Sequence, residues 1–131
     1  MPIEIPKDTW PGAVRKVTLG ATPAEGGTRS HTVTVGGEKA LSFHHFEAPM
    51  PHTPVIAVEI KDKRPEDWSP VLLKAWGDVV NNAADWAKAA EAAGADAIVL
   101  SLSLVPAAEA VQTVKQVLAA LGGVQFWRVA L

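Results

Sequence analysis

The hydrophobic pattern of the chain changes character near Pro54. Before it, two short runs rich in β-branched residues, 14–19 and 30–35, predict strands. The second run ends at Gly36-Gly37, a pair that readily adopts positive φ, and an apolar pattern resumes over 41–46. The runs on either side of the glycines predict a β-hairpin. A proline-rich stretch then interrupts regular structure.

After Pro54 the chain alternates between buried strands and helices. The nearly continuous apolar run at 54–60 is typical of a strand in a parallel sheet that is buried on both faces. Segment 95–100 is predicted to be a second buried strand, and 124–131 is a candidate for a third strand. Strand, helix, strand, helix, strand with short connections is the pattern of parallel βαβ units.

Two helices are predicted between these strands. The alanine-rich segment 83–93 has high helix propensity, and Asn82 is a favourable N-cap. Gly94 follows at the position where a left-handed residue ends a helix. Segment 106–121 begins with proline and carries an apolar stripe. A shorter piece of one or two helical turns fits 70–80.

We therefore predict an α/β fold in a single truncated domain. An N-terminal β-hairpin segment, 1–53, precedes a partial (β/α) TIM barrel over 54–131, with about two and a half βα units. A closed eight-stranded barrel takes roughly 250 residues, whereas this chain has 131. The sheet is therefore expected to have open edges.

Composition narrows the classes of function. A formal net charge of −2 supplies no basic field for nucleic acid. The absence of cysteine excludes disulfides, thiolate nucleophiles and cysteine-ligated zinc or iron–sulfur centres in this chain. No apolar run approaches the ~18 residues that span a membrane, and the N-terminus is unlike a signal peptide. We expect a cytoplasmic protein with neither a nucleic-acid nor a membrane partner.

A cluster of histidine and aromatic residues at 43–47 is the first candidate for chemistry. Neutral imidazoles bind metals and transfer protons, and Glu47 or Glu59 is available as a further ligand. Adjacent His44 and His45 on a strand, however, point to opposite faces. The cluster also precedes the first parallel strand, on the side where the floor of a βα barrel lies. We favour a structural role and predict no metal site.

Polar residues that follow the strands are better functional candidates, because βα barrels carry out their chemistry at the carboxyl ends of the strands. The weak candidates for cofactor binding are Glu59, Asp62, Ser101 and Ser103. Asp62 beside Lys61 also fits an ordinary solvated pair. Glu59 interrupts an apolar run, so it is either a functional group at the strand end or a carboxylate paired with Arg or Lys.

The segment Gly26-Gly27-Thr28-Arg29-Ser30-His31 combines glycine amides with a guanidinium, as anion sites do. It lacks the lysine and the following helix of a P-loop. We expect a turn in which Arg29 pairs locally. The five tryptophans are expected to be packing groups.

The string GGTRSHTVTVGGEKALSFHHFE, followed by PVIAVEIKD, closely resembles the small (delta) subunit of the corrinoid/iron–sulfur protein of the acetyl-CoA decarbonylase/synthase system. The resemblance runs from about Val14 to Gly122. It carries over no catalytic residue. It marks a structural motif made of Gly26, Gly27, Thr28, Arg29, Ser30, His31, Gly36, Gly37, His44, His45 and Phe46.

The resemblance implies a βα barrel that pairs with a large subunit, with a corrinoid between the two and an iron–sulfur cluster on the large partner. Such a complex accepts a methyl group from a methyl-tetrahydropterin and passes it from cobalt toward acetyl-CoA synthesis. It would meet a methyltransferase and acetyl-CoA synthase transiently. The chain is expected to assist in this transfer without being catalytic. The alternatives are a pterin-dependent methyltransferase-like barrel and a small stand-alone binding module with a histidine-lined site.

The end of the chain departs from the family pattern. After Gly123 the family has an apolar strand that ends in small residues and glycine, whereas this chain reads VQFWRVAL. One set of codons that would encode this string gives an AVLAGGA-like sequence when it is read in a shifted frame, and the family subunit is much longer. We therefore expect a truncated or frameshifted reading frame. Resequencing that finds an uninterrupted frame, with no barrel continuation downstream, would refute this expectation.

Overall fold

The computed structural model describes residues 2–4, 6, 11–40 and 48–130, the last six of these as backbone only. They form a mixed α/β protein with two small sheets and three α-helices. The chain divides into two compact units, Met1–Leu19 with Val33–Pro54, and Gly20–Thr32 with Val55–Leu131. Segment 20–32 therefore belongs with the α/β unit, although it lies within the predicted N-terminal segment 1–53.

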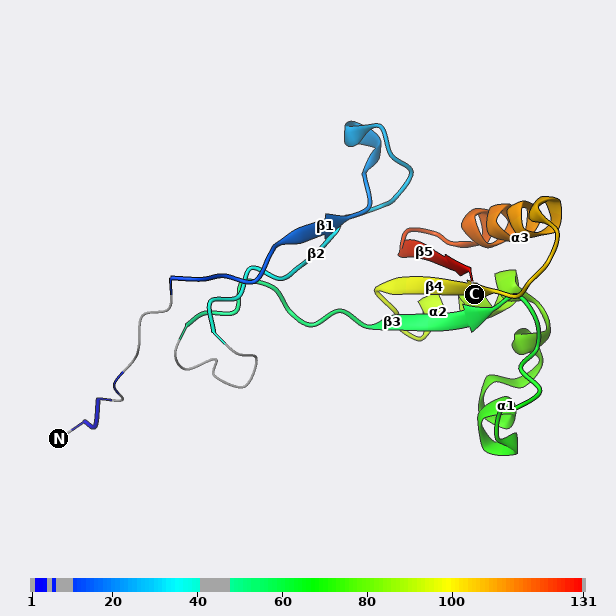
Figure 1. Cartoon of the computed structure of the whole chain (residues 1–131), viewed down its shortest axis with the longest axis horizontal. Helices are drawn as coiled ribbons and strands as arrows, with labels where there is room; N and C mark the ends of the chain where they lie inside the picture. The colour runs from blue at the N-terminus through cyan, green and yellow to red at the C-terminus, as the bar shows by residue number, and fades with distance from the viewer. Residues whose placement is uncertain (1, 5, 7–10, 41–47, 131) are drawn as a thin grey trace. The chain divides into compact units, whose positions relative to one another are not determined.

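The first unit contains a two-stranded antiparallel sheet. Strand β1 (Val17–Leu19) pairs with β2 (Val33–Val35), with Val17 opposite Val35 (Figure 1). The hydroxyls of Thr18 and Thr34 lie 3.0 Å apart across the strands and form a hydrogen bond. The β-branched runs predicted as strands thus contain the two strands, which are shorter than expected because pairing is limited to three residues each.

Gly36 and Gly37 both adopt positive φ, at 82° and 86°, as predicted. They lie inside the extended pairing of the two strands, because the Gly37 amide donates to the Val14 carbonyl (2.9 Å) and the Val14 amide to Glu38 (2.8 Å). A Cβ on Gly36 would overlap the carbonyl oxygen of Arg15, so glycine is required there. The predicted hairpin partner of β2, 41–46, lies outside the described residues.

The second unit is built on a parallel three-stranded sheet in the order β3-β4-β5 (Figure 1). The strands are β3 (Ala57–Lys61), β4 (Ala97–Leu102) and β5 (Gln125–Ala130). The helices are α1 (Pro70–Trp76), the 3-10 helix η2 (Gly77–Asn81) and α2 (Ala83–Ala92) between the first two strands, and α3 (Ala107–Ala120) before the third. The predicted alternation of strands and helices in a parallel sheet is confirmed.

The core of this unit lies on the face of the sheet that α2 and α3 cover. Ile60 of β3 and Ile98 and Leu100 of β4 are completely buried, together with Trp86 of α2 and Val117 of α3. Burial of each such side chain contributes about 1.5–3 kcal/mol. Since alternate residues of a strand point to opposite faces, this packing sets which residues of β3 and β4 point away from the helices.

Three tryptophans form the aromatic part of the core. Trp68 meets Trp86 at 5.3 Å between ring centroids with an interplanar angle of 88°, and Trp76 meets it at 6.0 Å and 62°. These are edge-to-face arrangements, which add to the apolar burial. The Trp86 Nε1 has no hydrogen-bond partner among the described residues. The predicted packing role is therefore confirmed for these three.

The ends of α2 follow the prediction. The Asn82 side-chain oxygen accepts from the amides of Ala84 (2.9 Å) and Asp85 (3.2 Å). Gly94, after the helix, has a φ of +95°. Asn82 thus satisfies two amide donors that the helix itself leaves free, and Gly94 allows the chain to turn into β4.

We predict that Asn82→Ala lowers the free energy of unfolding by about 1 kcal/mol, because two amides at the start of α2 lose their acceptor. The measurement is urea unfolding followed by far-ultraviolet circular dichroism. Asn82→Asp is the matched control, since it keeps the acceptor oxygen and should unfold near the wild-type midpoint. Equal losses for both variants would contradict a capping role.

Candidate functional site

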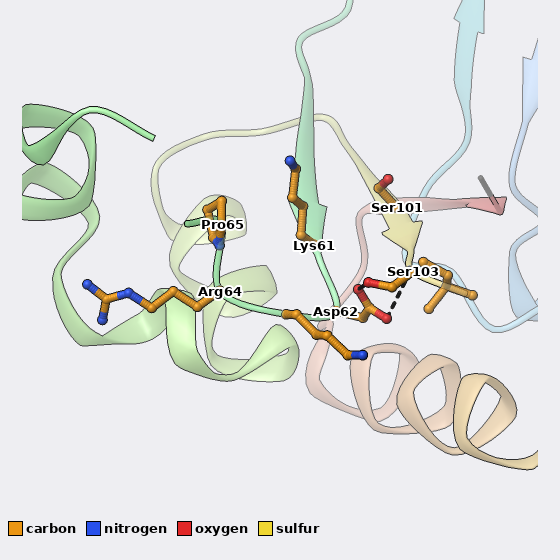
Figure 2. A pocket seen from close by; sticks show the side chains of 8 residues that line it. Lys61, Asp62, Arg64, Pro65, Ser101 and Ser103 are labelled. Atoms are coloured by element: carbon orange, nitrogen blue, oxygen red, sulfur yellow. Dashed lines mark hydrogen bonds between the residues drawn. The ribbon is translucent and has the colours of Figure 1, made fainter. Parts of the chain in front are cut away.

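A pocket of about 220 Å³ lies at the carboxyl ends of β3 and β4 (Figure 2). In parallel α/β sheets this is the edge at which ligands bind. The polar and charged residues that line it are Lys61, Asp62, Lys63, Arg64, Ser101 and Ser103. Three of the four candidates from the sequence, Asp62, Ser101 and Ser103, are thus brought together.

Asp62 ties the two strand ends to each other. Its Oδ2 accepts from the Ser103 amide at 3.0 Å and its Oδ1 from the Ser103 hydroxyl at 2.6 Å (Figure 2). The Asp62 amide in turn donates to the Ser101 carbonyl at 3.2 Å. With both carboxylate oxygens engaged, Asp62 holds the loop after β4 in place instead of serving as a free base.

The pocket carries more positive than negative charge, since it has three cationic residues and one carboxylate. Within the described part of the chain, Lys61 and Lys63 form no ion pair or side-chain hydrogen bond. Arg64 donates to the Asn81 side chain at 3.1 Å and extends away from Ser101 and Ser103 (Figure 2). Lys63 and Arg64 were not predicted, although the charged loop after the first buried strand was a signal for them.

Lys61 and Ser101 are neighbours across the sheet. They are directly paired in the β3–β4 register, and their side chains extend to the same side (Figure 2). Ser101 is only 5% exposed, and its hydroxyl has no hydrogen-bond partner among the described residues. The pocket therefore presents a hydroxyl that no described residue binds, beside an ammonium group that forms no ion pair with them.

Glu59 is exposed and lies two residues before Lys61, on the same face of β3. Its register partner on β4 is Val99. No arginine or lysine pairs with Glu59 in the ranges that the structure describes. Glu59 was predicted to be either a functional group at the strand end or a carboxylate paired with Arg or Lys. The pairing is not observed among the described residues.

The Gly26–His31 motif forms a tight turn after the 3-10 helix η1 (Pro23–Glu25). Gly26 has a φ of +78°, and the Gly27 amide returns to the Thr22 carbonyl at 2.9 Å. The Glu25 carboxylate accepts from the Thr22 amide (2.9 Å) and hydroxyl (2.8 Å). These two bonds, the amide first, lower the pKa of Glu25, because they stabilise its charged form.

Arg29 and Ser30 extend from this turn to the chain that enters β5. The expected local partner of Arg29 exists, since Nη2 donates to the Thr28 hydroxyl at 3.4 Å, but the shorter bond runs from Nη1 to the Val124 carbonyl at 3.1 Å. Ser30 packs so closely on Gly123 that a Cβ there would overlap the Ser30 hydroxyl. The motif therefore contacts the amino end of β5.

Glu91 of α2 completes this arrangement at the amino end of β5. Its carboxylate accepts from the amides of Gly122 (3.0 Å) and Gly123 (3.1 Å). A carboxylate that accepts two backbone amides holds a turn firmly. The sequence did not mark Glu91, because it reads as an ordinary solvated helix residue.

The remaining residues of the predicted motif are only partly visible. Gly36 accepts a hydrogen bond at its carbonyl from the His52 ring at 2.8 Å, whereas His44, His45 and Phe46 lie outside the described residues. Among the described residues no group of three or more His, Cys, Asp or Glu side chains is placed to hold a metal ion. None of their helices is long and apolar enough to cross a membrane.

Comparison with known proteins finds one consistent similarity. Residues 16–124 match the family model described as CO dehydrogenase/acetyl-CoA synthase delta subunit. The chain is 43% identical over 127 residues to acetyl-CoA decarbonylase/synthase complex subunit delta of Archaeoglobus fulgidus, covering 88% of this chain and 27% of that protein. It is 35% identical over 120 residues to subunit delta 1 of Methanosarcina thermophila, covering 86% and 27%. The chain thus spans about a quarter of the length of these curated relatives.

We predict that Asp62→Ala speeds amide hydrogen exchange at Ser103 by up to about tenfold, because the amide loses a hydrogen bond worth about 1 kcal/mol. Ser103→Ala keeps the amide bond to Asp62 and should change this rate much less. Exchange is followed residue by residue by NMR. Asp67→Ala removes a carboxylate from the same charged loop and serves as the control. Equal acceleration in all three variants would show that the hydrogen bonds of Asp62 do not hold the loop at Ser103.

We predict that Gly123→Ala lowers the free energy of unfolding by about 1–3 kcal/mol, because the new methyl group overlaps Ser30. The φ of Gly123 is not positive, so the backbone itself accepts alanine. Combining Gly123→Ala with Ser30→Gly removes the overlap and should recover most of the loss. Chemical unfolding of both single variants and the double variant measures this coupling. Strictly additive losses would show that the two residues do not touch.

Proposed function

Because the chain belongs to the CO dehydrogenase/acetyl-CoA synthase delta-subunit family, we propose that it acts as a subunit or fragment of a corrinoid/iron–sulfur protein. In this role it takes part in methyl transfer from a methyl-tetrahydropterin to the corrinoid cobalt during acetyl-CoA synthesis and cleavage. The observation that carries the proposal is the family match over 16–124, together with 43% identity to the Archaeoglobus fulgidus delta subunit.

The proposed architecture is a partial (β/α) barrel. Its support is the parallel β3-β4-β5 sheet, whose buried core lies between the sheet and helices α2 and α3. Helices cover only the outer face of the strands in such a barrel. The exposed Ala57 and Glu59 of β3 fit strands whose second face lines a barrel interior. The Gly26–His31 motif is proposed as an architectural element at the amino end of β5, on the basis of its bonds there.

We assign the chain an assisting role instead of a catalytic one. Within the described residues, the pocket at the strand ends contains a single carboxylate, and both of its oxygens are bound to Ser103. The ammonium groups of Lys61 and Lys63 offer hydrogen-bond donors and no acceptor. The pocket is therefore suited to holding a ligand group in position and carries no evident acid–base pair.

The proposed cofactor arrangement is the one that the family resemblance implies, and the residues of this chain are compatible with it. A pocket of about 220 Å³ is smaller than the roughly 300–1,000 Å³ of ordinary ligand sites, so it cannot enclose a corrin ring. As the family resemblance implies, the corrinoid is proposed to lie between this chain and a large subunit. An iron–sulfur cluster does not fit this chain, which has no cysteine, and is assigned to the large partner.

The proposed partners follow from the same family. The large subunit of the corrinoid/iron–sulfur protein would be the stable partner, and a methyltransferase and acetyl-CoA synthase would bind transiently. We place the complex in the cytoplasm. The proposal of partner subunits is supported by the names of the curated relatives, which describe subunits of an acetyl-CoA decarbonylase/synthase complex.

We predict that this chain, carrying an affinity tag and co-expressed with a large corrinoid subunit, retains that subunit and its corrinoid absorbance on the resin. A full-length delta subunit of a relative is the positive control, and the tag alone is the negative control. Circular dichroism establishes whether the chain is folded. If the folded chain retains nothing while the full-length control retains the partner, the proposed function fails for this chain.

A further inference from the structure

We propose that the pocket at the ends of β3 and β4 binds an oxyanion, a phosphate or carboxylate group of a ligand, through the Lys61 ammonium and the Ser101 hydroxyl. This inference goes beyond the proposed function and does not depend on it. It names a ligand chemistry for a site to which neither the family match nor the names of the relatives assign one.

The first support is the hydroxyl of Ser101, which lines the pocket. Ser101 is 5% exposed and lines the pocket, yet its hydroxyl has no hydrogen-bond partner in the described ranges. The Ser101 hydroxyl oxygen is not among the fully buried polar atoms that lack a partner, so it is accessible from the pocket. The Ser101 hydroxyl is therefore free to donate a hydrogen bond to an acceptor on a ligand.

The second support is the position of Lys61. It is the direct register partner of Ser101, and both side chains extend to the same side of the sheet (Figure 2). Lys61 has no ion-pair partner in the described part of the chain. A hydroxyl and an ammonium group side by side provide hydrogen-bond donors and positive charge, which is the complement of an oxyanion.

The third support is that the pocket has no free carboxylate to compete for these donors. Asp62 is the carboxylate among its lining residues, and Ser103 occupies both of its oxygens. Lys63 adds a second unpaired cation to the lining. The charge balance therefore favours an anion over a cation or a neutral ligand.

Glu59 is expected to oppose anion binding, and this provides an additional test of the proposal. It lies two residues before Lys61 on the same face of β3 and has no cationic partner among the described residues. Its negative charge repels an anion at Lys61 without blocking the site. Replacing this charge should therefore strengthen binding, which a purely structural role for these residues would not produce.

The size of the pocket limits what enters it. About 220 Å³ accommodates an oxyanion and a few attached atoms but not an entire cofactor. The pocket thus fits the anionic end of a larger ligand. Lysine is a point charge without the bidentate geometry of arginine, so the pocket geometry is compatible with both phosphate and carboxylate.

The test is an NMR titration of the whole chain, with amide shifts followed while sodium phosphate or sodium acetate replaces sodium chloride at constant ionic strength. We expect saturable shifts at Lys61, Ser101 and Ser103. Tighter binding of phosphate than acetate identifies a phosphate-bearing ligand, and the reverse identifies a carboxylate. An absence of saturable shifts with both anions overturns the proposal.

Substitutions test whether Lys61 and Ser101 bind the anion. Lys61→Gln should weaken binding at least about fivefold, because one charge-assisted contact is lost. Ser101→Ala should weaken it as well, and Glu59→Gln should strengthen it. Lys88→Gln removes an exposed lysine on α2 and is the matched control for Lys61→Gln.

The result of the anion titration can be distinguished from the result of the co-expression experiment with a large corrinoid subunit. Spectra of each variant that match the wild type outside the pocket show that it is folded, and Ser101→Ala tests the site if Lys61→Gln does not fold. Equal weakening by Lys61→Gln and Lys88→Gln means general charge attraction and overturns the proposal. Since no partner subunit is present, the result does not depend on whether the chain retains one.

Discussion

The packing of α2 and α3 on one face of the β3–β4 pair is the constraint on which the α/β unit depends. Ile60, Ile98 and Leu100 are buried with Trp86 and Val117. Because strand residues alternate between faces, burying this set turns the intervening residues away from the helices. A shift of one residue in register would expose the whole apolar set, so the apolar packing keeps the strands aligned. The positions of the polar residues at the strand ends are a consequence of that alignment.

The pocket is a product of this register. With β3 and β4 parallel and paired from Ala57–Ala97 to Lys61–Ser101, their carboxyl ends emerge together. Asp62 then reaches Ser103 on the neighbouring strand end and fixes the loop that follows β4. The hydrophobic core thus positions charged groups that do not contact it. Because Asp62 is hydrogen-bonded to Ser103, Lys61 and Lys63 remain the unpaired charges of the pocket within the described part of the chain.

The residues at the carboxyl ends of β3 and β4 could be predicted from the sequence better than the contacts at the amino end of β5. Asp62, Ser101 and Ser103 were chosen as candidates because general rules place function at the carboxyl ends of parallel strands, and the structure places all three in the lining of one pocket. The partners at the other end were not identified, because the Arg29 guanidinium reaches a carbonyl 95 residues away and Glu91 binds the amides that precede β5. Backbone acceptors and donors have no signature in the sequence, so contacts of this kind depend on the three-dimensional path of the chain.

The sequence by itself determined the local elements and the family. Apolar runs, the Asn82 cap and the glycines predict the helices and strands of the second unit, because these signals depend on neighbouring residues. The motif from Gly26 onward identified the family to which the chain belongs, now supported by a match over 16–124. Only the tertiary structure decided that Ser101 lies beside Lys61 in the pocket, and that the motif contacts the amino end of β5. Both depend on which distant segments pack together, a property that burial and register establish and that no local pattern records.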